Sequence, residues 1–385
     1  MPRAARHTVD TPEHWRDVRQ LLNQHRHELA GVASPLYPRA RRVATSPLLC
    51  CQQWVPGVPV ELDRVMLGWV EDAPAPAVDG TEAVAEGVRP FCADAERYPA
   101  YADALGALDP PAVFENRSAY RLLAADLTSE KPRMSLARGR YFDGVNVGEA
   151  VAHELAAAWR DDPAALAMER LPFRRAVGDP CDLPRRSAMP AITTLTLRRL
   201  PSGEASFLLH WRDPAKVTHG GGLYQVLPVG IFQPAGDTQA DERNDFSLWR
   251  CMVREFSEEV LGASEDYRSL GSPLDYSQWA LYQQLSSART AGKLGVYCLG
   301  VGVDPLTFAV DILTVAVFDS DVFDAAFDGR AAVNAEGRVI SERGADGVPF
   351  ARDTLARFIG GTEPMQAAGV AVLQLAWDHK AHLLA

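Results

Sequence analysis

Residues 254–259 read Arg-Glu-Phe-Ser-Glu-Glu, and this stretch is the most informative in the chain. On a helix, Glu255, Glu258 and Glu259 fall at positions i, i+3 and i+4, so their carboxylates crowd one face. Like charges at this spacing repel by roughly 0.2–0.5 kcal/mol per pair unless a cation lies among them. Because Mg²⁺ prefers carboxylate oxygens and bridges them to substrate phosphates, the stretch predicts a metal–diphosphate site.

The alternative interpretation is a solvated acidic helix face without a ligand. At about 100° per residue, Leu248, Cys251 and Met252 lie within roughly 60° of Glu255, on the same side of the helix. The acidic face therefore continues an apolar stripe, which a purely solvated face would oppose. This pattern favours the wall or floor of a cleft.

The surroundings of this stretch resemble the signature of the Nudix hydrolase family, G-x5-E-x7-R-E-U-x-E-E-x-G-U, in which U is bulky and apolar. Residues 254–259 fit the R-E-U-x-E-E core residue by residue, and five residues separate Gly236 from Glu242 as the signature requires. Eleven residues, where the family has seven, separate Glu242 from Arg254. Two residues precede Gly262 where the family has one. The four added residues amount to about one helical turn, so Glu242 is not assigned the role of its family counterpart.

The resemblance covers residues 190–385 and implies an α+β protein with a C-terminal Nudix-like α/β/α sandwich and an N-terminal mixed α/β domain. It implies Mg²⁺- or Mn²⁺-dependent hydrolysis of a nucleoside-diphosphate-type or other diphosphate substrate. By residue matching, Glu255, Glu258 and Glu259 would be catalytic metal ligands, one of them relaying a proton. Arg254 would orient a glutamate by ion pairing without touching substrate; the alternative for Arg254 is a surface cation.

A second candidate region is the loop at 210–219, which follows an expected strand and concentrates hydrogen-bond donors and an aromatic ring. Arg212 and Lys216 are suited to grip phosphate oxygens. Trp211 could stack on a base or simply pack, and the whole loop could equally be a polar hairpin connection. Two further candidate substrate-binding residues border the strand that leads into the motif, Tyr224 and Gln233.

Composition limits the class of protein. The 385 residues are 47% hydrophobic and 23% charged, which is ordinary for a globular chain of about two domains. A net charge of −11 and no obvious basic patch argue against a direct nucleic-acid partner.

No apolar run approaches the roughly 18 residues that cross a bilayer, and the basic amino end is followed by polar residues, so we expect no membrane partner and a cytoplasmic location. Six scattered cysteines without a C-x-x-C pair indicate mostly buried thiols.

Along the chain, we expect an N-terminal helical segment at 1–35, a mixed α/β domain of unknown role at 36–189 and the Nudix-like domain at 190–385. Thr11 followed by Pro12 is typical of a helix start. The Pro/Arg-rich residues 180–190 mark the boundary. The remaining expected helices are 146–159, 246–261, 276–291, 350–359 and 363–384, and the expected strands are 59–67, 191–200, 205–211, 223–232, 296–303 and 312–318.

Three classes of function remain open. The first is the diphosphate hydrolase, favoured by the intact glutamates. The second is a catalytically inactive Nudix-fold ligand sensor or regulator that acts through a protein partner, favoured by the stretched spacing upstream of Arg254. The chain also resembles a group of bacterial proteins, some labelled regulators, that share such a carboxyl half. The third is an interaction scaffold in which apolar positions of the last helix pack a homodimer: Val370, Leu373, Leu375 and Trp377.

Overall fold

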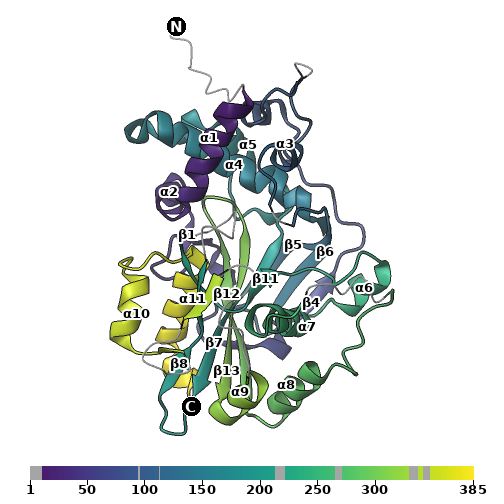
Figure 1. Cartoon of the computed structure of the whole chain (residues 1–385), viewed down its shortest axis with the longest axis vertical. Coiled ribbons are helices and arrows are strands. Elements are labelled where there is room, and N and C mark those ends of the chain that lie inside the picture. Colours follow the sequence, from purple (N-terminus) through teal and green to yellow (C-terminus); the bar gives the residue numbers. More distant parts are fainter. Residues whose placement is uncertain are drawn as a thin grey trace.

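The structure is a computed structural model, and it describes residues 11–93, 96–111, 113–212, 222–264, 271–328, 337–340 and 347–385, with the backbone alone for 337–340. Helices and sheets both contribute to its core, so the expected α+β class is confirmed. Figure 1 shows the N-terminal helices gathered at one end of the molecule and the central strands running toward the other.

The largest sheet has nine strands in the order β1-β2-β12-β13-β7-β8-β15, with β11 pairing β7 and β3 pairing β12. At its centre β12 is antiparallel to β13, and β13 is parallel to β7. Strands β12 and β13 read as nearly continuous apolar runs because helices cover both of their faces, whereas β7 also carries three buried threonines, Thr193, Thr194 and Thr196. Their bounds are β1 Arg41–Arg42, β2 Leu49–Cys50, β3 Val60–Glu61, β7 Pro190–Arg199, β8 Ala205–Phe207, β11 Val229–Ile231, β12 Leu294–Val303, β13 Val310–Asp319 and β15 Val348–Pro349.

Two three-stranded sheets flank the large one. The first has the order β10-β9-β14, with β9 antiparallel to both neighbours. The second has the order β4-β6-β5, with β4 parallel and β5 antiparallel to β6. Their bounds are β9 Leu209–Arg212, β10 Tyr224–Val226, β14 Gly337–Ile340, β4 Met66–Trp69, β5 Ser118–Asp126 and β6 Arg133–Arg140.

Helices of the C-terminal half lie on both sides of the large sheet (Figure 1). On one side α11 contacts β7, β12 and β13, and on the other α7 contacts β7 and β11. Helix α8 packs on β12, and α9 packs on β13 and β7. Their bounds are α7 Leu248–Glu255, α8 Ala280–Thr290, α9 Ser320–Ala326, α10 Arg352–Ile359, α11 Ala367–Asp378 and α12 Lys380–Leu383.

The N-terminal helices pack on one another around α4, which contacts α1, α3 and α5. Thr11 caps α1 by accepting a hydrogen bond from the His14 amide at 3.2 Å, with Pro12 as the first helical residue, so the expected helix start is confirmed. Buried Arg19 of α1 pairs with buried Glu149 of α4. The bounds are α1 Pro12–Gln24, α2 Arg26–Ala33, α3 Tyr101–Leu108, α4 Tyr141–Asp161, α5 Pro172–Val177 and, farther along the chain, α6 Gln239–Asn244.

Several expected elements differ from the structure. The helix expected at 246–261 ends as α7 at Glu255 and continues as a π-helical turn, Phe256–Val260. The strand expected at 223–232 is two strands in different sheets, β10 and β11, because Pro228 between them has no N–H to donate. The strand expected at 205–211 is also divided between two sheets: β8 pairs antiparallel with β7 as expected, whereas β9 pairs with β10 and β14.

Strands β1, β2 and β3 come from residues 41–61, yet β2 and β3 pair with β12. The large sheet therefore takes strands from both sides of residue 190, where we expect the domain boundary. The division of the chain into domains stays a prediction.

The last long helix does not offer its apolar residues to a partner. Val370, Leu373 and Leu375 are buried within the chain, and Trp377 packs against Phe350 at 5.5 Å between ring centroids. The scaffold hypothesis is therefore wrong about this helix face, because α11 covers the chain's own sheet.

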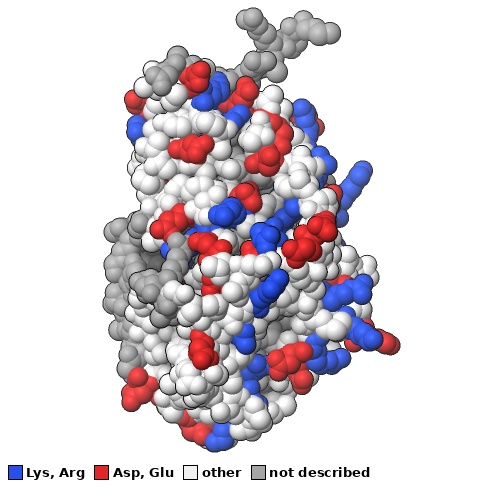
Figure 2. All heavy atoms as spheres, turned by 90° about the vertical axis from the view of Figure 1, so that its right-hand side faces the viewer, with Lys and Arg blue, Asp and Glu red and all other residues white. Residues whose placement is uncertain are grey.

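Two surface properties bear on partners. In the part of the chain that the structure describes, no helix combines the length and apolar character needed to cross a membrane. Figure 2 shows Lys and Arg side chains interleaved with Asp and Glu on the face it presents, without a continuous basic area.

Candidate active site

The glutamate-bearing segment begins as a regular helix. The Ser247 side chain caps α7 by accepting a hydrogen bond from the Arg250 amide at 3.3 Å. The π-helical turn that follows carries Glu258 and Glu259 and ends before Gly262, whose φ is 72°. π-Helical turns within α-helices occur frequently at functional sites. The three glutamates therefore lie where the helix widens, on its last two turns.

The carboxyl groups of Glu255 and Glu259 both contact β11. Glu255 is 9% exposed, and its carboxyl group lies against Gly230, where an ideal Cβ would come within 1.9 Å of the carboxyl carbon. Glu259 accepts a hydrogen bond at 2.7 Å from the backbone N–H of Val229. The absence of a side chain at Gly230 and the backbone N–H of Val229 thus bring both carboxylates to the strand that precedes the motif.

Cys251, one turn before Glu255, lies near two of the three glutamates. Burial raises the pKa of its thiol above the ordinary value, and the nearby carboxylates of Glu255 and Glu258 raise it further. The Cys251 Sγ also lies 3.6 Å from the carbonyl oxygen of Ile231 in β11. Glu255 and Glu258 therefore share the side of the helix that continues the apolar stripe, as the sequence spacing predicts.

Arg254 is 3% exposed, so the surface-cation alternative is wrong. Its Nη1 donates to the Tyr276 hydroxyl at 2.7 Å and lies 3.3 Å from Oδ1 of Asp245, while Nη2 donates to the carbonyl of Gln233. Tyr276 in turn donates to Asp245 at 2.7 Å. Burial opposes the charged form, but Cys251, Tyr276, Asp245 and Glu255 together raise the pKa of Arg254. The acid in direct contact with Arg254 is thus an aspartate, and Glu255 acts on it electrostatically.

The upstream part of the motif lies at the junction with the N-terminal half. Glu242 forms two hydrogen bonds with Arg138 of β6, at 2.7 and 2.6 Å, and these bonds raise the pKa of Arg138. The backbone carbonyl of Glu242 accepts a bond from the Tyr120 hydroxyl at 2.8 Å. Gly236 leaves room for Asp241, which closes the N-terminal cap of α6. Glu242 therefore links the two halves.

The candidate substrate residues fall in two places. Trp211 and Tyr224 are paired across β9 and β10, and Arg212 ends β9. The Tyr224 ring packs on Phe358 at 5.4 Å between centroids. Gln233 follows β11, and its carbonyl holds Arg254. Lys216, with the rest of residues 213–221, lies outside the described residues.

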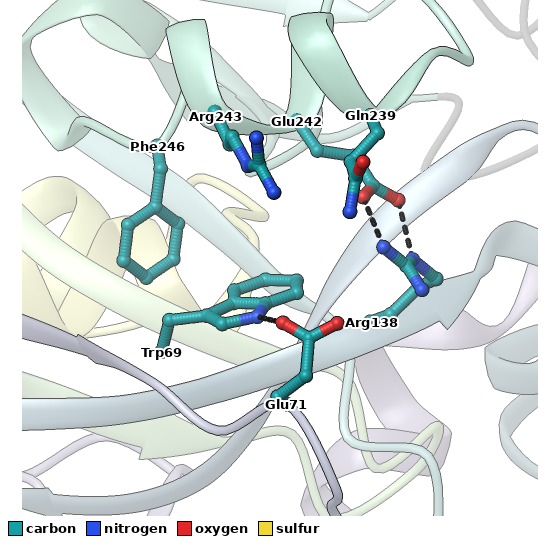
Figure 3. Close-up of a pocket in the computed structure, with 7 residues that line it drawn as sticks. All are labelled: Trp69, Glu71, Arg138, Gln239, Glu242, Arg243 and Phe246. Carbon is teal, nitrogen blue, oxygen red and sulfur yellow. Dashed lines mark hydrogen bonds and ion pairs between the residues drawn. The ribbon is translucent and has the colours of Figure 1, made fainter.

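Sequence reasoning missed several residues at and near this site. Asp245 and Tyr276, which hold Arg254, are separated from it by 9 and 22 residues and follow no repeating pattern. It also missed a cavity that neighbours α6, whose walls include Trp69 and Arg138 (Figure 3). For the cavity, the sequence offered one signal, the five-residue spacing from Gly236 to Glu242, because Glu242 is one of the residues that line it.

The residue types fit a hard divalent cation, since the candidate ligands are all carboxylates. Among the residues that the structure describes, however, no three His, Cys, Asp or Glu side chains are gathered into a group that could hold a metal by themselves. A metal here would therefore need further oxygen ligands from water or substrate.

No protein-family model matches this chain, and the search of curated proteins finds no match. Among solved structures, the chain is similar to a Nudix hydrolase from Alicyclobacillus acidocaldarius, with 18% sequence identity and a TM-score of 0.26. The match covers 49% of this chain and 90% of that one. A likeness of this size assigns neither a family nor an activity to the chain.

Proposed function

We propose that residues 190–385 form a Nudix-like domain that hydrolyses a diphosphate-containing small molecule of the nucleoside-diphosphate type. The observation that supports this most directly is the seating of Glu255 and Glu259 on β11, beside Gly230 and the Val229 N–H. Holding carboxylates together at half-buried positions is costly in free energy. A divalent cation bound between them and substrate phosphates would offset that cost.

Glu255, Glu258 and Glu259 would hold Mg²⁺ or Mn²⁺, with water and substrate phosphate completing the coordination. When bound, the ion would polarise the phosphorus, neutralise the leaving phosphate and lower the pKa of the attacking water. Glu259 keeps its position through the Val229 N–H. Arg254 holds the helix against Asp245 and Gln233 and does not reach substrate. Trp211, Arg212, Tyr224, Gln233 and Lys216 are the proposed substrate contacts.

A ligand sensor without catalysis is the second candidate. It is favoured by the engagement of Glu242 with Arg138, which commits one acid of the extended motif to a contact between the two halves. A regulator needs such a connection to pass ligand binding to the rest of the chain and on to a protein partner.

The two candidates are separated by a phosphate-release screen over nucleotide sugars, dinucleotides and nucleoside triphosphates with and without Mg²⁺. Glu258→Gln and Glu259→Gln should each reduce turnover by about 100-fold or more, since each removes a proposed metal ligand, without unfolding the protein. Glu130→Gln, an equal change of charge in an exposed loop, is the matched control. Turnover at the wild-type rate in both motif variants would show that these glutamates are not catalytic. A ligand that raises the melting temperature while no product forms would identify the sensor.

A further inference from the structure

A cavity of about 230 Å³ lies between α6 and the small sheet of the N-terminal half, at the junction of the two halves (Figure 3). Trp69 and Arg138 reach it from β4 and β6, and Gln239 and Arg243 reach it from α6. None of the three motif glutamates is among its walls. It is therefore a separate place from the proposed hydrolytic site.

Trp69 provides a fixed aromatic surface in this cavity. Its indole N–H donates to Glu71 at 2.6 Å, which sets the orientation of the ring. Phe246 meets the ring edge-on, with centroids 5.4 Å apart and planes at 87°, and Tyr120 does the same at 6.2 Å. Figure 3 shows the indole below the open space and the side chains of α6 above it.

Two polar side chains of α6 are available to a ligand. The side chains of Gln239 and Arg243 form no hydrogen bond or ion pair with any residue that the structure describes, and both extend toward the open space (Figure 3). In contrast, Glu242 and Arg138 satisfy each other through two hydrogen bonds. The available groups are thus one guanidinium and one amide, placed across the cavity from an indole.

The charges and shapes of these side chains favour one chemical class of ligand. A cationic ligand would meet two guanidinium groups, and a polyanion would meet the carboxylates of Glu71 and Glu242. A neutral planar ring can stack on Trp69 and beneath the Arg243 guanidinium, since both groups stack on aromatic faces. The Gln239 amide offers a donor and an acceptor to the polar edge of such a ring. The volume is below the roughly 300–1,000 Å³ of drug-sized ligand sites, so it suits one ring system.

A second cavity of about 300 Å³ adjoins the first, because Glu71 and Arg138 line both. Its walls include Asp143 and Ser187, whose side chains suit hydroxyl groups. We propose that the two cavities together bind a nucleoside, with its base between Trp69 and Arg243 and its sugar toward Asp143 and Ser187. The site is distinct from the proposed hydrolytic one, and its ligand bridges the N-terminal and C-terminal halves.

The test is calorimetric titration of the full-length chain with adenosine, guanosine, cytidine and uridine, with ribose alone as the reference. At least one nucleoside should bind at one per chain, and ribose should bind far more weakly. Trp69→Leu keeps an apolar side chain but removes the stacking surface, so affinity should fall about 10- to 100-fold. Arg243→Met should weaken binding about 10-fold.

Arg243 has no described partner to lose, so Arg243→Met keeps the test informative if Trp69→Leu destabilises the fold. Arg352→Met, which removes an exposed guanidinium of α10, is the matched control and should bind as the wild type does. Absence of binding by all four nucleosides at millimolar concentration would overturn the proposal, and so would equal affinity in wild type, Trp69→Leu and Arg243→Met. Glu258→Gln should still bind nucleoside. If the chain proves not to be a hydrolase, nucleosides should still bind at this second site. If no nucleoside binds, the hydrolase proposal is unaffected, because it depends only on the motif glutamates.

Discussion

The carboxyl group of Glu255 occupies the space beside Gly230 that a side chain at position 230 would fill. An ideal Cβ on Gly230 would lie 1.9 Å from the carboxyl carbon of Glu255, and real Cβ atoms essentially never show contacts under 3.0 Å. Gly230 lies in β11 and Glu255 ends α7. This contact therefore places the Glu255 carboxyl group directly against the strand, where any side chain at position 230 would displace it.

We expect Gly230→Ala to displace the Glu255 carboxyl and to lower the free energy of unfolding by about 1–3 kcal/mol, as overpacking does in a well-packed region. Turnover by the proposed hydrolase should fall with it, because Glu255 can no longer sit beside Glu258. Chemical denaturation and the phosphate-release assay measure the two effects.

Gly68→Ala is the matched control, since Gly68 also lies in a strand and its added Cβ would meet nothing closer than 3.8 Å. In a Glu255→Ala background, Gly230→Ala should cost much less stability, giving a coupling energy of about 0.5–3 kcal/mol. Strictly additive effects of the two changes would contradict the contact.

Local patterns predicted much of the fold. Thr11 and Pro12 mark a helix start by their own chemistry, and the apolar runs that became β12 and β13 are buried on both faces. Strand β6 was not predicted, because Arg133, Arg138 and Arg140 dilute its pattern and its strand state depends on pairing with β4 and β5.

In the candidate site, too, local features could be predicted from the sequence and long-range contacts could not. The spacing of Glu255 and Glu258 predicts a shared face, which is a local property of a helix. The pair formed by Arg138 and Glu242 joins residues 104 apart, and no local pattern carries such a contact. The π-helical turn also depends on how the helix end meets the sheet.

The buried arrangement around Arg254 predicts an order of stability effects. Arg254→Met would leave Asp245, which is 0% exposed, without its cation, so we expect a loss of about 3–5 kcal/mol. Tyr276→Phe removes one hydroxyl that bonds both residues and should cost about 1–3 kcal/mol. Denaturation curves measure both, with Arg352→Met as an exposed control. A larger loss for Tyr276→Phe would mean that Arg254 is not the main partner of Asp245.

Glu154 predicts a pH dependence of stability. Burial raises its pKa from 4.5 to about 7, although the amides of Phe173 and Arg174 bond its carboxylate at 2.7 and 2.8 Å. Between pH 4.5 and 7 the folded state then binds more protons than the unfolded state, so stability should fall as pH rises through this window. The loss could reach about 3 kcal/mol.

Glu154→Gln cannot ionise, so its unfolding free energy should vary less between pH 4.5 and 7 than that of the wild type. Denaturant midpoints at several pH values in this window measure the difference. Glu130→Gln, in an exposed loop, should keep the wild-type slope. Identical slopes for wild type and Glu154→Gln would show that Glu154 ionises normally in the folded chain.

The pair between Arg138 and Glu242 should couple the two halves energetically. Glu242 has a side chain only 9% exposed, whereas that of Arg138 is 51% exposed, so removing the arginine leaves a buried carboxylate unpaired. We expect Arg138→Met to cost about 1–2 kcal/mol, above the usual value for an exposed pair because the contact has two hydrogen bonds and a buried acceptor.

Glu242→Gln in the Arg138→Met background should recover part of that loss, since a neutral amide is easier to bury than a carboxylate. If the pair also transmits ligand binding between the halves, the double variant should remain folded but lose any effect of nucleosides on phosphate release. Denaturation of the four variants in the cycle and turnover with added nucleoside measure these two outcomes. Additive stability effects would show that Arg138 and Glu242 do not stabilise each other, despite their two hydrogen bonds.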